Sequence, residues 1–389
     1  MNNSASSNSL SAEQLRALNQ QAISELREGR AESARNACIT AIQGGANNAS
    51  VWGVLALACR DMGDSEQAIQ AADRSLALEP RNPRVLVVKG DAFYGRGDWR
   101  ASGAFYRDAL KFASPANCPV EMKAELERAQ SRVAELNERF ERHISSRAAP
   151  LLAASGNTSR MREAVEILCN RRQVYYPQPK HIFFPGLPLV EFGDANEFSW
   201  VAEVESAADD IREELLSVIA GDSGFAPYLT ASSDRPVYDV HGMADNDSWS
   251  AFYLWENGEP VDENQAKCPK TTAAIEKVPL VFSGKRCPNV LFSRLKAGAV
   301  IPPHTGMVNT RFICHLPLVI PEGCGFRVGN DTRSWEFGKV WLFDDTIEHE
   351  AWNNSPHDRY VLIFEVWRPE LSLEEQELVT TLLQAVDEY

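Results

Sequence analysis

The first third of the chain repeats one pattern of small, apolar and turn-forming residues. Blocks of 34 residues that begin at Leu15, Ala49 and Pro83 carry small side chains at positions 8, 20 and 27, and glycine at position 15. These residues are Ala22, Ala34, Ala41, Ala56, Ala68, Ser75, Gly90, Ser102 and Ala109, with the glycines Gly29, Gly63 and Gly97. Small side chains let paired helices approach closely, and glycine suits the turn between them. The pattern therefore predicts three stacked helical hairpins.

The period and its register resemble the tetratricopeptide repeat. Apolar residues at spacings of three and four predict a further helix at Val120–His143, which suits the polar-faced cap of such a solenoid. We therefore expect an α-solenoid over residues 15–144, preceded by a disordered tail at residues 1–14. Such a solenoid offers a concave groove to a peptide or partner protein. A spacer or a dimerisation arm is an equally open interpretation.

After the repeats, the pattern changes to a connection and then to a sheet domain. Residues 145–180 contain Ala-, Ser- and Pro-rich stretches, which predict a linker with one short helix. The expected elements here and beyond are a short helix at Thr158–Asn170, a helix at Phe198–Ile219, a strand at Trp249–Trp255 and a C-terminal helix within residues 372–389. A capping box formed by Ser372 and Glu375 marks the start of the last helix.

Between residues 290 and 367 the chain reads as short apolar runs broken by Gly, Asn and Asp. The predicted strands are Val290–Leu295, Phe312–Ile320, Gly325–Val328, Lys339–Phe343, Glu348–Trp352 and Tyr360–Trp367. Short strands in even succession are typical of an antiparallel sandwich or barrel. We expect this mainly-β domain to occupy residues 181–371 and to be flanked by helices.

The composition limits the classes of partner that we expect for this chain. There are 39 Lys and Arg against 54 Asp and Glu, a net charge of −15, so the basic footprint of a nucleic-acid-binding protein is missing. No apolar run approaches the ~20 residues that span a bilayer, and the first residues do not resemble a secretory signal. The eight scattered cysteines are expected to be free thiols in a reducing cytoplasm. Whether Cys268 and Cys287 pair stays open.

Two histidines follow separate β elements and are candidate metal ligands. His304 lies after a Pro-Pro turn, and His349 follows an acidic loop. Two histidines and one carboxylate commonly hold Fe(II) with open coordination positions. The residue two beyond His304 is Gly306, which has no side chain to offer. Either a nearby acid substitutes, or iron is held by two histidines and water.

The segment that runs from IPPHTGMVNTRFICHLPLVIPEG to DDTIEHEAWNNSPHDRYVLIFEVWRPEL, with WENG and CPNVLFSRLKAGA before it, resembles the aspartyl/asparaginyl β-hydroxylase family of 2-oxoglutarate dioxygenases. The resemblance covers residues 181–371, about half the chain. It implies a double-stranded β-helix of jelly-roll or cupin-like type, and Fe(II), 2-oxoglutarate and dioxygen as metal and co-substrates. His-x-Gly also stands in the family's iron site, so Gly306 is expected there.

The resemblance assigns roles to particular residues. It implies that His304 and His349 ligate Fe(II), and that the Arg359 guanidinium holds the distal carboxylate of 2-oxoglutarate. The other implied site residues are Ser293 and His315 for the co-substrate, Asp345 beside the metal, and Asn309 and Arg311 shaping the pocket. Simpler interpretations remain: Arg359 paired with Glu365 or Asp358, His315 as a core histidine, and Asp345 capping a turn.

These residues favour an enzyme that hydroxylates an amino-acid side chain of the Asp or Asn type in a peptide or protein, with the repeats recruiting substrate or partner. One departure bears on the substrate. Hydroxylases of peptide aspartate usually carry another basic residue two positions after the one matching Arg311, and this chain has Ile313. The alternatives are the same iron chemistry on a free amino acid, a lipid or a natural-product intermediate, and a non-catalytic repeat scaffold.

Overall fold

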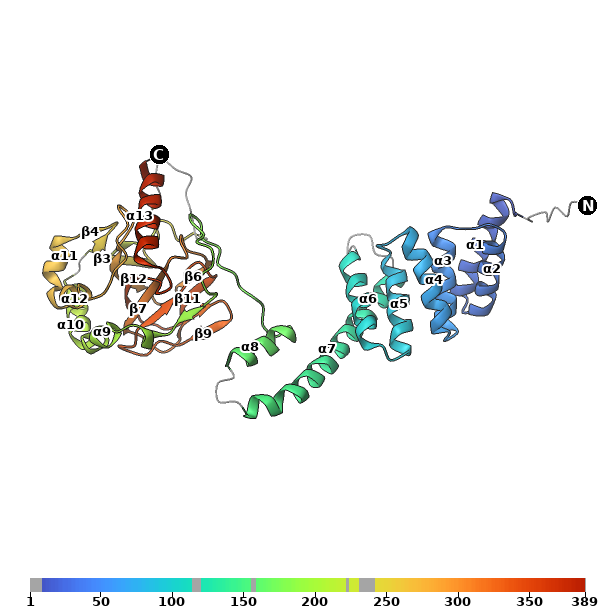
Figure 1. Cartoon of the computed structure of the whole chain (residues 1–389), viewed down its shortest axis with the longest axis horizontal. Helices are drawn as coiled ribbons and strands as arrows, with labels where there is room; N and C mark the ends of the chain where they lie inside the picture. The colour runs from blue at the N-terminus through green and yellow to red at the C-terminus, as the bar shows by residue number, and fades with distance from the viewer. Residues whose placement is uncertain (1–8, 114–119, 155–158, 222–223, 231–241, 389) are drawn as a thin grey trace, which may run out of the picture. The chain divides into compact units, whose positions relative to one another are not determined.

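The computed structural model describes residues 9–113, 120–154, 159–221, 224–230 and 242–388. The chain divides into two compact units, Met1–Arg171 and Arg172–Tyr389. The first unit is helical, and the second is built mainly from antiparallel strands with helices around them (Figure 1).

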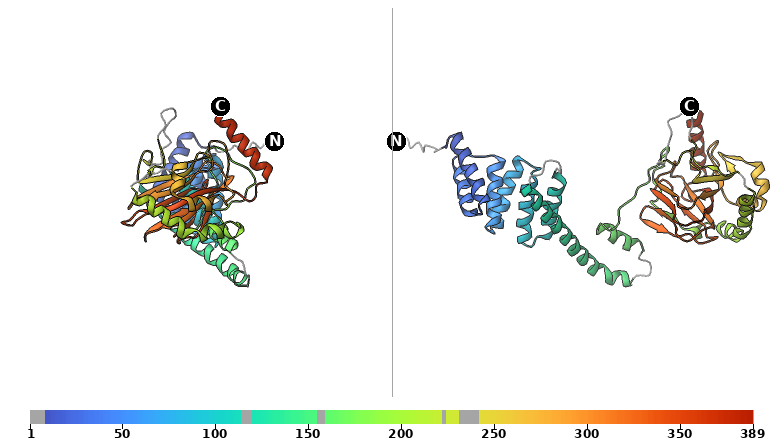
Figure 2. Two further views of the ribbon diagram at one scale, coloured as in Figure 1. Left: turned by 90° about the vertical axis from the view of Figure 1, so that its left-hand side faces the viewer. Right: turned by 180° about the vertical axis from the view of Figure 1, so that it is seen from behind.

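The first unit begins with three helical hairpins, stacked side by side (Figure 2). Their helices are α1 (Ala12–Arg27), α2 (Ala31–Gln43), α3 (Ala49–Asp61), α4 (Ser65–Leu78), α5 (Pro83–Gly95) and α6 (Trp99–Phe112). The second helices of the hairpins begin at Ala31, Ser65 and Trp99, so the structure keeps the 34-residue period. These hairpins are the predicted tetratricopeptide repeats.

The start of the solenoid differs slightly from the prediction. Helix α1 begins at Ala12, with a capping box between Ser11 and Gln14. Residues 12–14 therefore belong to the first repeat and not to a tail, because the Ser11 side chain and the Gln14 side chain satisfy the first free backbone N–H groups of the helix. Residues 1–8 of the predicted tail lie outside the described part of the chain.

The small residues of the repeat lie where the helices meet. All nine residues at positions 8, 20 and 27 are buried. At Gly90 a Cβ would lie 2.7 Å from the ring of Tyr106, and the Ser102 hydroxyl donates to the Gly90 carbonyl. Gly29, Gly63 and Gly97 have positive φ angles of 77°, 79° and 75° at the turns within the hairpins. Close helix packing thus explains why large residues are absent from these positions.

Helix α7 (Val120–Ala154) packs after the third hairpin, in contact with α5 and α6. It is longer than the helix predicted at Val120–His143, so residues 145–154, expected to be a loose linker, are helical. Pro150 lies inside this helix, although proline removes a backbone donor and clashes with the preceding turn; the neighbouring alanines are strong helix formers. Helix α8 (Ser159–Leu168) matches the short helix expected in this region.

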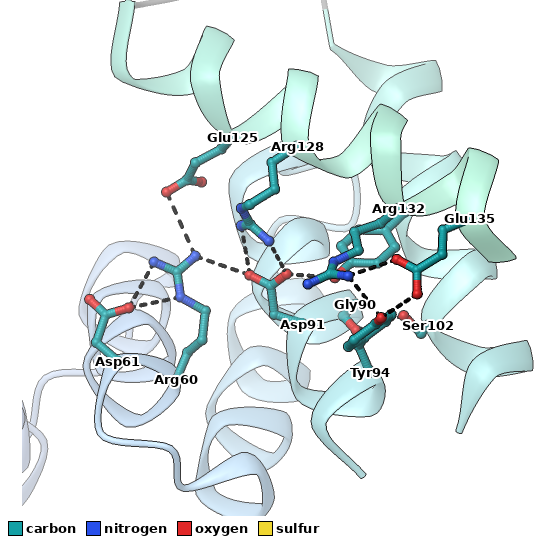
Figure 3. A network of polar contacts seen from close by, with 11 residues as sticks. Arg60, Asp61, Gly90, Asp91, Tyr94, Ser102, Glu125, Arg128, Arg132 and Glu135 are labelled. Atoms are coloured by element: carbon teal, nitrogen blue, oxygen red, sulfur yellow. Dashed lines mark hydrogen bonds and ion pairs between the residues drawn. The ribbon is translucent and has the colours of Figure 1, made fainter. Parts of the chain in front are cut away.

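A polar network joins α7 to the repeats (Figure 3). The Asp91 carboxylate of α5 accepts from Arg60 of α3, from Tyr106 of α6 and from Arg128 of α7. Farther along α7, Arg132 donates to the Tyr94 hydroxyl at 2.8 Å. One carboxylate therefore ties four helices together and holds α7 in the place of the next repeat's first helix.

The second unit contains an eight-stranded and a four-stranded antiparallel sheet. The order in the first is β1-β10-β7-β12-β5-β3-β2, with β4 paired to β3, and in the second β6-β11-β8-β9. The strands are β1 (Phe192–Gly193), β2 (Ala226–Pro227), β3 (Trp249–Glu256), β4 (Glu259–Pro260), β5 (Val290–Leu295), β6 (Val300–His304), β7 (Arg311–Val319), β8 (Cys324–Val328), β9 (Asp331–Arg333), β10 (Trp341–Phe343), β11 (His349–Asn353) and β12 (Arg359–Trp367).

Alternate side chains of a strand point to opposite faces of the sheet and pack in two separate hydrophobic clusters. On β12, Leu362, Phe364 and Val366 pack in the cluster that includes the flanking helices, whereas Val361 packs in the cluster between the sheets. The helices are η2 (Ala195–Glu197), α9 (Val201–Ser206), α10 (Ala208–Ala220), α11 (Asp262–Lys267) and α12 (Pro269–Ile275). The single helix predicted at Phe198–Ile219 is therefore interrupted, and forms α9 and α10.

The segment that leads into the sheet domain lies against the loop after β6 and the loop before β11. Backbone N–H groups of Gln178, Lys180 and His181 donate to the carbonyls of Thr346, Gly306 and Met307. At the other end, α13 (Leu373–Glu388) begins with the predicted capping box, in which the Ser372 N–H donates to Glu375 at 2.8 Å. The extended residues after Arg172 are thus part of the sheet domain.

The cysteines in the described part of the chain are free thiols. Cys268 and Cys287 are buried free thiols, as are the other cysteines in the described part of the chain apart from the half-buried Cys169. Among the helices that the structure describes, none has both the length and the apolar character needed to cross a membrane.

Candidate active site

A cavity of about 210 Å³ lies between the two sheets. Its walls include alternate residues of three neighbouring strands: Leu291 and Ser293 of β5, Arg311, Ile313 and His315 of β7, and Arg359, Ile363 and Glu365 of β12. Successive side chains of a strand point to opposite faces, so every second residue faces the cavity. His304, Asp345 and His349 line it from the four-stranded side.

The two candidate ligands are cross-strand partners. His304 ends β6, His349 begins β11, and the two are paired in the antiparallel register. Their ring centroids are 4.1 Å apart. Directly opposed residues in a sheet bring their side chains together, which explains how residues far apart in sequence share one site.

Backbone carbonyls orient both imidazole rings. Nδ1 of His304 lies 2.8 Å from the Pro302 carbonyl oxygen, and Nδ1 of His349 lies 3.0 Å from that of Ile347. A carbonyl only accepts, so the proton of each neutral ring is on Nδ1 and the Nε2 lone pair is free. Burial lowers the pKa of both histidines, that of His349 well below its usual range. Both rings are therefore in the form that binds a metal.

The Asp345 carboxylate occupies the space beside Gly306. A Cβ on Gly306 would lie 1.9 Å from Oδ2 of Asp345, and the Gly306 N–H donates to the Asp345 carbonyl at 2.6 Å. Among the described residues no three His, Cys, Asp or Glu side chains are disposed as a metal site. Asp345 is thus the acid that lies beside Gly306, in the space that a side chain at position 306 would take.

We predict that Gly306→Ala destabilises the sheet domain by about 1–3 kcal/mol, because the added methyl displaces a buried carboxylate. Asp345→Ala should relieve the clash, so the double variant should be no less stable than Asp345→Ala alone. Thermal or urea unfolding of the two single variants and the double variant measures this coupling. Strictly additive losses would contradict the contact between Gly306 and Asp345.

At the start of β12, a buried cation has unused donors. Arg359 is 1% exposed, and its Nε and Nη1 have no hydrogen-bond partner. Its guanidinium lies 4.8 Å from the centre of the Trp335 ring. Burial lowers the pKa of Arg359 to about 10. Neither Glu365 nor Asp358 forms an ion pair with it among the described contacts, so the simpler explanation of Arg359 as a strand-pairing residue does not fit.

His315 and Ser293 line the same cavity. His315 is 6% exposed, its Nδ1 has no partner, and burial lowers its pKa well below the usual range. The Ser293 hydroxyl accepts from Nε1 of Trp249 at 3.3 Å. Both residues therefore lie where an additional ligand could reach them, although the His315 ring also packs 5.0 Å from Phe343.

Arg311 lies in a cluster of opposite charges. Its Nη1 is 2.7 Å from Glu365, and its Nη2 is 3.7 Å from Asp345. Burial is the main cause that raises the pKa of Asp345, to about 7. Asn309, by contrast, does not line the cavity: its side chain exchanges two hydrogen bonds with the Phe184 backbone. Asn309 thus fixes the segment beside the site.

Several residues in or beside the cavity were not singled out from the sequence as site residues. Trp249 lines the cavity, stacks on Tyr228 at 4.1 Å and donates to Ser293. Trp335 is outside the cavity wall, and its ring centre lies 4.8 Å from the Arg359 guanidinium. Glu365 was considered only as a partner for Arg359. Strand alternation places Glu365 on the same face as Arg359, so that signal was present. Trp249 could not be placed in the cavity from the sequence, because its position there depends on the pairing of β3 with β5 in the sheet.

The fold and the cavity define an antiparallel sheet domain with a pair of histidines in its pocket. Residues 205–369 match the model of the aspartyl/asparaginyl beta-hydroxylase family.

Named relatives agree. The human aspartyl/asparaginyl beta-hydroxylase is 41% identical over 165 residues, which are 42% of this chain and 20% of that protein. The ornithine lipid ester-linked acyl 2-hydroxylase of Rhizobium tropici is 32% identical over 179 residues, 45% of this chain and 60% of that protein. The chain thus spans less than two thirds of either relative.

The helical unit is similar to the type III secretion translocator chaperone SycD of Yersinia enterocolitica. The TM-score is 0.31, with 17% identity, over 35% of this chain and 92% of that chain.

Proposed function

We propose that this chain is an Fe(II)- and 2-oxoglutarate-dependent dioxygenase that hydroxylates an amino-acid side chain of the Asp or Asn type in a peptide or protein. The observation that carries this proposal is the presence, in one cavity, of two neutral imidazoles 4.1 Å apart and a buried arginine with unpartnered donors. The first feature suits a divalent metal, and the second suits a carboxylate. The match of residues 205–369 to a hydroxylase family model supports the same reaction.

The proposal gives a role to the polar side chains that line the cavity. His304 and His349 would hold Fe(II) through Nε2, with Asp345 accepting a hydrogen bond beside the metal. Arg359 would bind the distal carboxylate of 2-oxoglutarate, helped by His315 and Ser293. When bound, iron and 2-oxoglutarate supply the oxidising chemistry from dioxygen, with release of succinate and carbon dioxide. The chain positions the reactants and excludes water from the buried cavity.

We also propose that strands β5–β12 form a double-stranded β-helix. The support is the division of these eight consecutive strands into two sets of four, β10-β7-β12-β5 and β6-β11-β8-β9. Double-sheet jelly rolls share eight strands between two sheets in this manner. The repeats would recruit the substrate or a partner through a concave surface, which stacked helical hairpins commonly provide.

A second candidate is the same chemistry on a lipid acyl chain. The Rhizobium relative, whose name describes such a hydroxylase, supports it. Ile313, where a second basic residue usually serves peptide aspartate, also lines the cavity. Product analysis separates the two candidates, since a hydroxylated peptide and a hydroxylated lipid differ in mass and solubility.

The proposal is tested with the full-length chain loaded anaerobically with Fe(II). Addition of 2-oxoglutarate and air should produce succinate, and a chelator should stop it. Cell extracts are then searched by mass spectrometry for peptides, metabolites and lipids that gain one oxygen atom. Absence of succinate from iron-loaded, folded protein would refute the proposed chemistry.

A further inference from the structure

The cavity has a second polar end, remote from Arg359. Arg359 and Glu365 both face the cavity from β12 and are six residues apart, which corresponds to about 20 Å along a strand. In the antiparallel register Glu365 is opposite Ile313, and Trp367 is opposite Arg311. A co-substrate bound at Arg359 would therefore leave the Arg311–Glu365 end of the cavity for another ligand.

This end is built from three buried side chains with unused hydrogen-bonding atoms. Glu365, Asp345 and Arg311 are 5%, 8% and 9% exposed. Glu365 Oε2, Asp345 Oδ1 and Arg311 Nε have no partner in the described structure. Buried polar atoms are usually paired, and each that is not carries a cost. Two acceptors and one donor at this end of the cavity thus lack a partner within the described structure.

One guanidinium faces two acidic side chains in this cluster. Arg311 contacts Glu365 at 2.7 Å and Asp345 at 3.7 Å, and its Nη1 also donates to Cys287 Sγ at 3.1 Å. Nη1 of Arg311 is therefore engaged, Nη2 faces Asp345 beyond hydrogen-bond distance, and Nε has no partner. A substrate carboxylate would find donors on Arg311 alone, and the unpaired carboxylate oxygen of Glu365 would repel it.

Three side-chain endings of similar size can be compared with this arrangement. A carboxylate only accepts, so it matches Arg311 and opposes the two acids. An ammonium only donates, so it matches the acids and opposes Arg311. A primary carboxamide has two N–H donors for Glu365 and Asp345 and one carbonyl oxygen for Arg311 Nε. It is the ending that satisfies all three atoms.

We infer that the Arg311–Glu365–Asp345 cluster binds a primary carboxamide of the substrate, and that Glu365 determines the preference of this site for an amide over a carboxylate. The inference deepens the proposed function, on which it rests for placing this group beside the reacting carbon. Among the Asp- and Asn-type substrates of that proposal, it selects the asparagine type.

The test uses three blocked amino acids as probes: N-acetyl methylamide derivatives of asparagine, aspartate and 2,4-diaminobutyrate. Their side chains end in an amide, a carboxylate and an ammonium. Dissociation constants for the full-length chain, with and without Fe(II) and 2-oxoglutarate under anaerobic conditions, come from ligand-observed NMR titration. The asparagine derivative should bind at least about tenfold more tightly than the aspartate derivative, since one mismatched charged contact costs about 1.5–3 kcal/mol.

Glu365→Gln then tests the residue. Its amide replaces one acceptor by a donor, so we expect binding of the asparagine derivative to weaken and binding of the aspartate derivative to strengthen, reducing the ratio about tenfold. Glu336→Gln, an exposed glutamate outside the cavity, should leave the ratio unchanged. Thermal melts verify that both variants fold. If Glu365→Gln does not fold, the three-probe comparison on the unaltered chain still decides.

Equal or tighter binding of the aspartate or diaminobutyrate derivative would overturn the inference, as would no binding of any probe up to its solubility limit. Free asparagine, added as a fourth probe, distinguishes a small-molecule source of the amide from a peptide source. Succinate formation is measured separately. Selective binding of the amide without succinate formation would refute the proposed dioxygenase activity and leave this inference standing. Succinate formation together with a preference for the carboxylate would support the activity and refute this inference.

Discussion

Replacement of His349 by alanine should reduce iron-dependent conversion of 2-oxoglutarate to succinate to the level of a protein-free control. His349 supplies one of two imidazoles whose Nε2 atoms are free, and a single remaining imidazole would not retain Fe(II) through dialysis. The domain should remain folded. Loss of the His349 ring leaves the Ile347 carbonyl without its 3.0 Å partner, which costs about 1 kcal/mol.

The matched control is His357→Ala. His357 is exposed in the turn between β11 and β12, so its loss should change neither iron content nor turnover. Iron per chain, succinate per minute and the melting temperature are measured on the same preparations. Full turnover by folded His349→Ala protein would exclude His349 from the site, and a large fall in melting temperature would show that its role is structural.

Replacement of Arg359 by methionine should have opposite effects on stability and on co-substrate binding. In the ligand-free protein, Arg359 is a fully buried cation with two unpartnered nitrogens. Burial of an unpaired charge is unfavourable, and exchange of buried ion pairs for apolar side chains of similar volume often stabilises a protein by about 1–4 kcal/mol. We therefore expect the melting temperature of the variant to rise and the stabilisation by added 2-oxoglutarate to disappear.

The pKa of Arg359 supports the sign of this effect. Burial lowers the pKa to about 10, so the charged form is less favourable in the folded than in the unfolded chain, and the guanidinium destabilises the fold at neutral pH. Arg327→Met is the matched control, because Arg327 donates to Glu348 at 2.9 Å and to the Gly329 carbonyl. That variant should melt lower and keep its response to 2-oxoglutarate.

Thermal melts with and without 2-oxoglutarate, together with direct titration of 2-oxoglutarate, measure both effects. A variant of Arg359 that melts lower than the parent and responds to 2-oxoglutarate as the parent does would assign Arg359 to the strand pairing of β12. The opposite signs are what distinguish a ligand-binding arginine from a structural one.

Local patterns predicted much of this fold because they reflect local physics. The 34-residue period follows from helices that pack through small residues, so the repeats could be predicted from Ala, Ser and Gly positions alone. The strand at Val290–Leu295 was predicted with its observed bounds. The histidine pair could be expected as a pair, although its cross-strand register came only from the structure.

Other features depend on contacts between elements that are far apart in the sequence, and the sequence alone does not show these contacts. Strands β6 and β9 were not predicted, since β6 contains two prolines and β9 has three residues. The cluster at Glu365 needs β7 beside β12, an order set by the whole sheet. The burial of Arg359 could not be predicted either, because arginine is seldom fully buried.

The hydrogen bonds from residues 180 and 181 to the loop that follows His304 determine where a shortened chain can begin. The family model matches residues 205–369, yet the backbone N–H groups of Lys180 and His181, upstream of that match, donate to the carbonyls of Gly306 and Met307. A fragment cut at residue 205 would lose both of these hydrogen bonds. A fragment intended to keep the loop after His304 in place should therefore begin near Arg172, where the second compact unit starts.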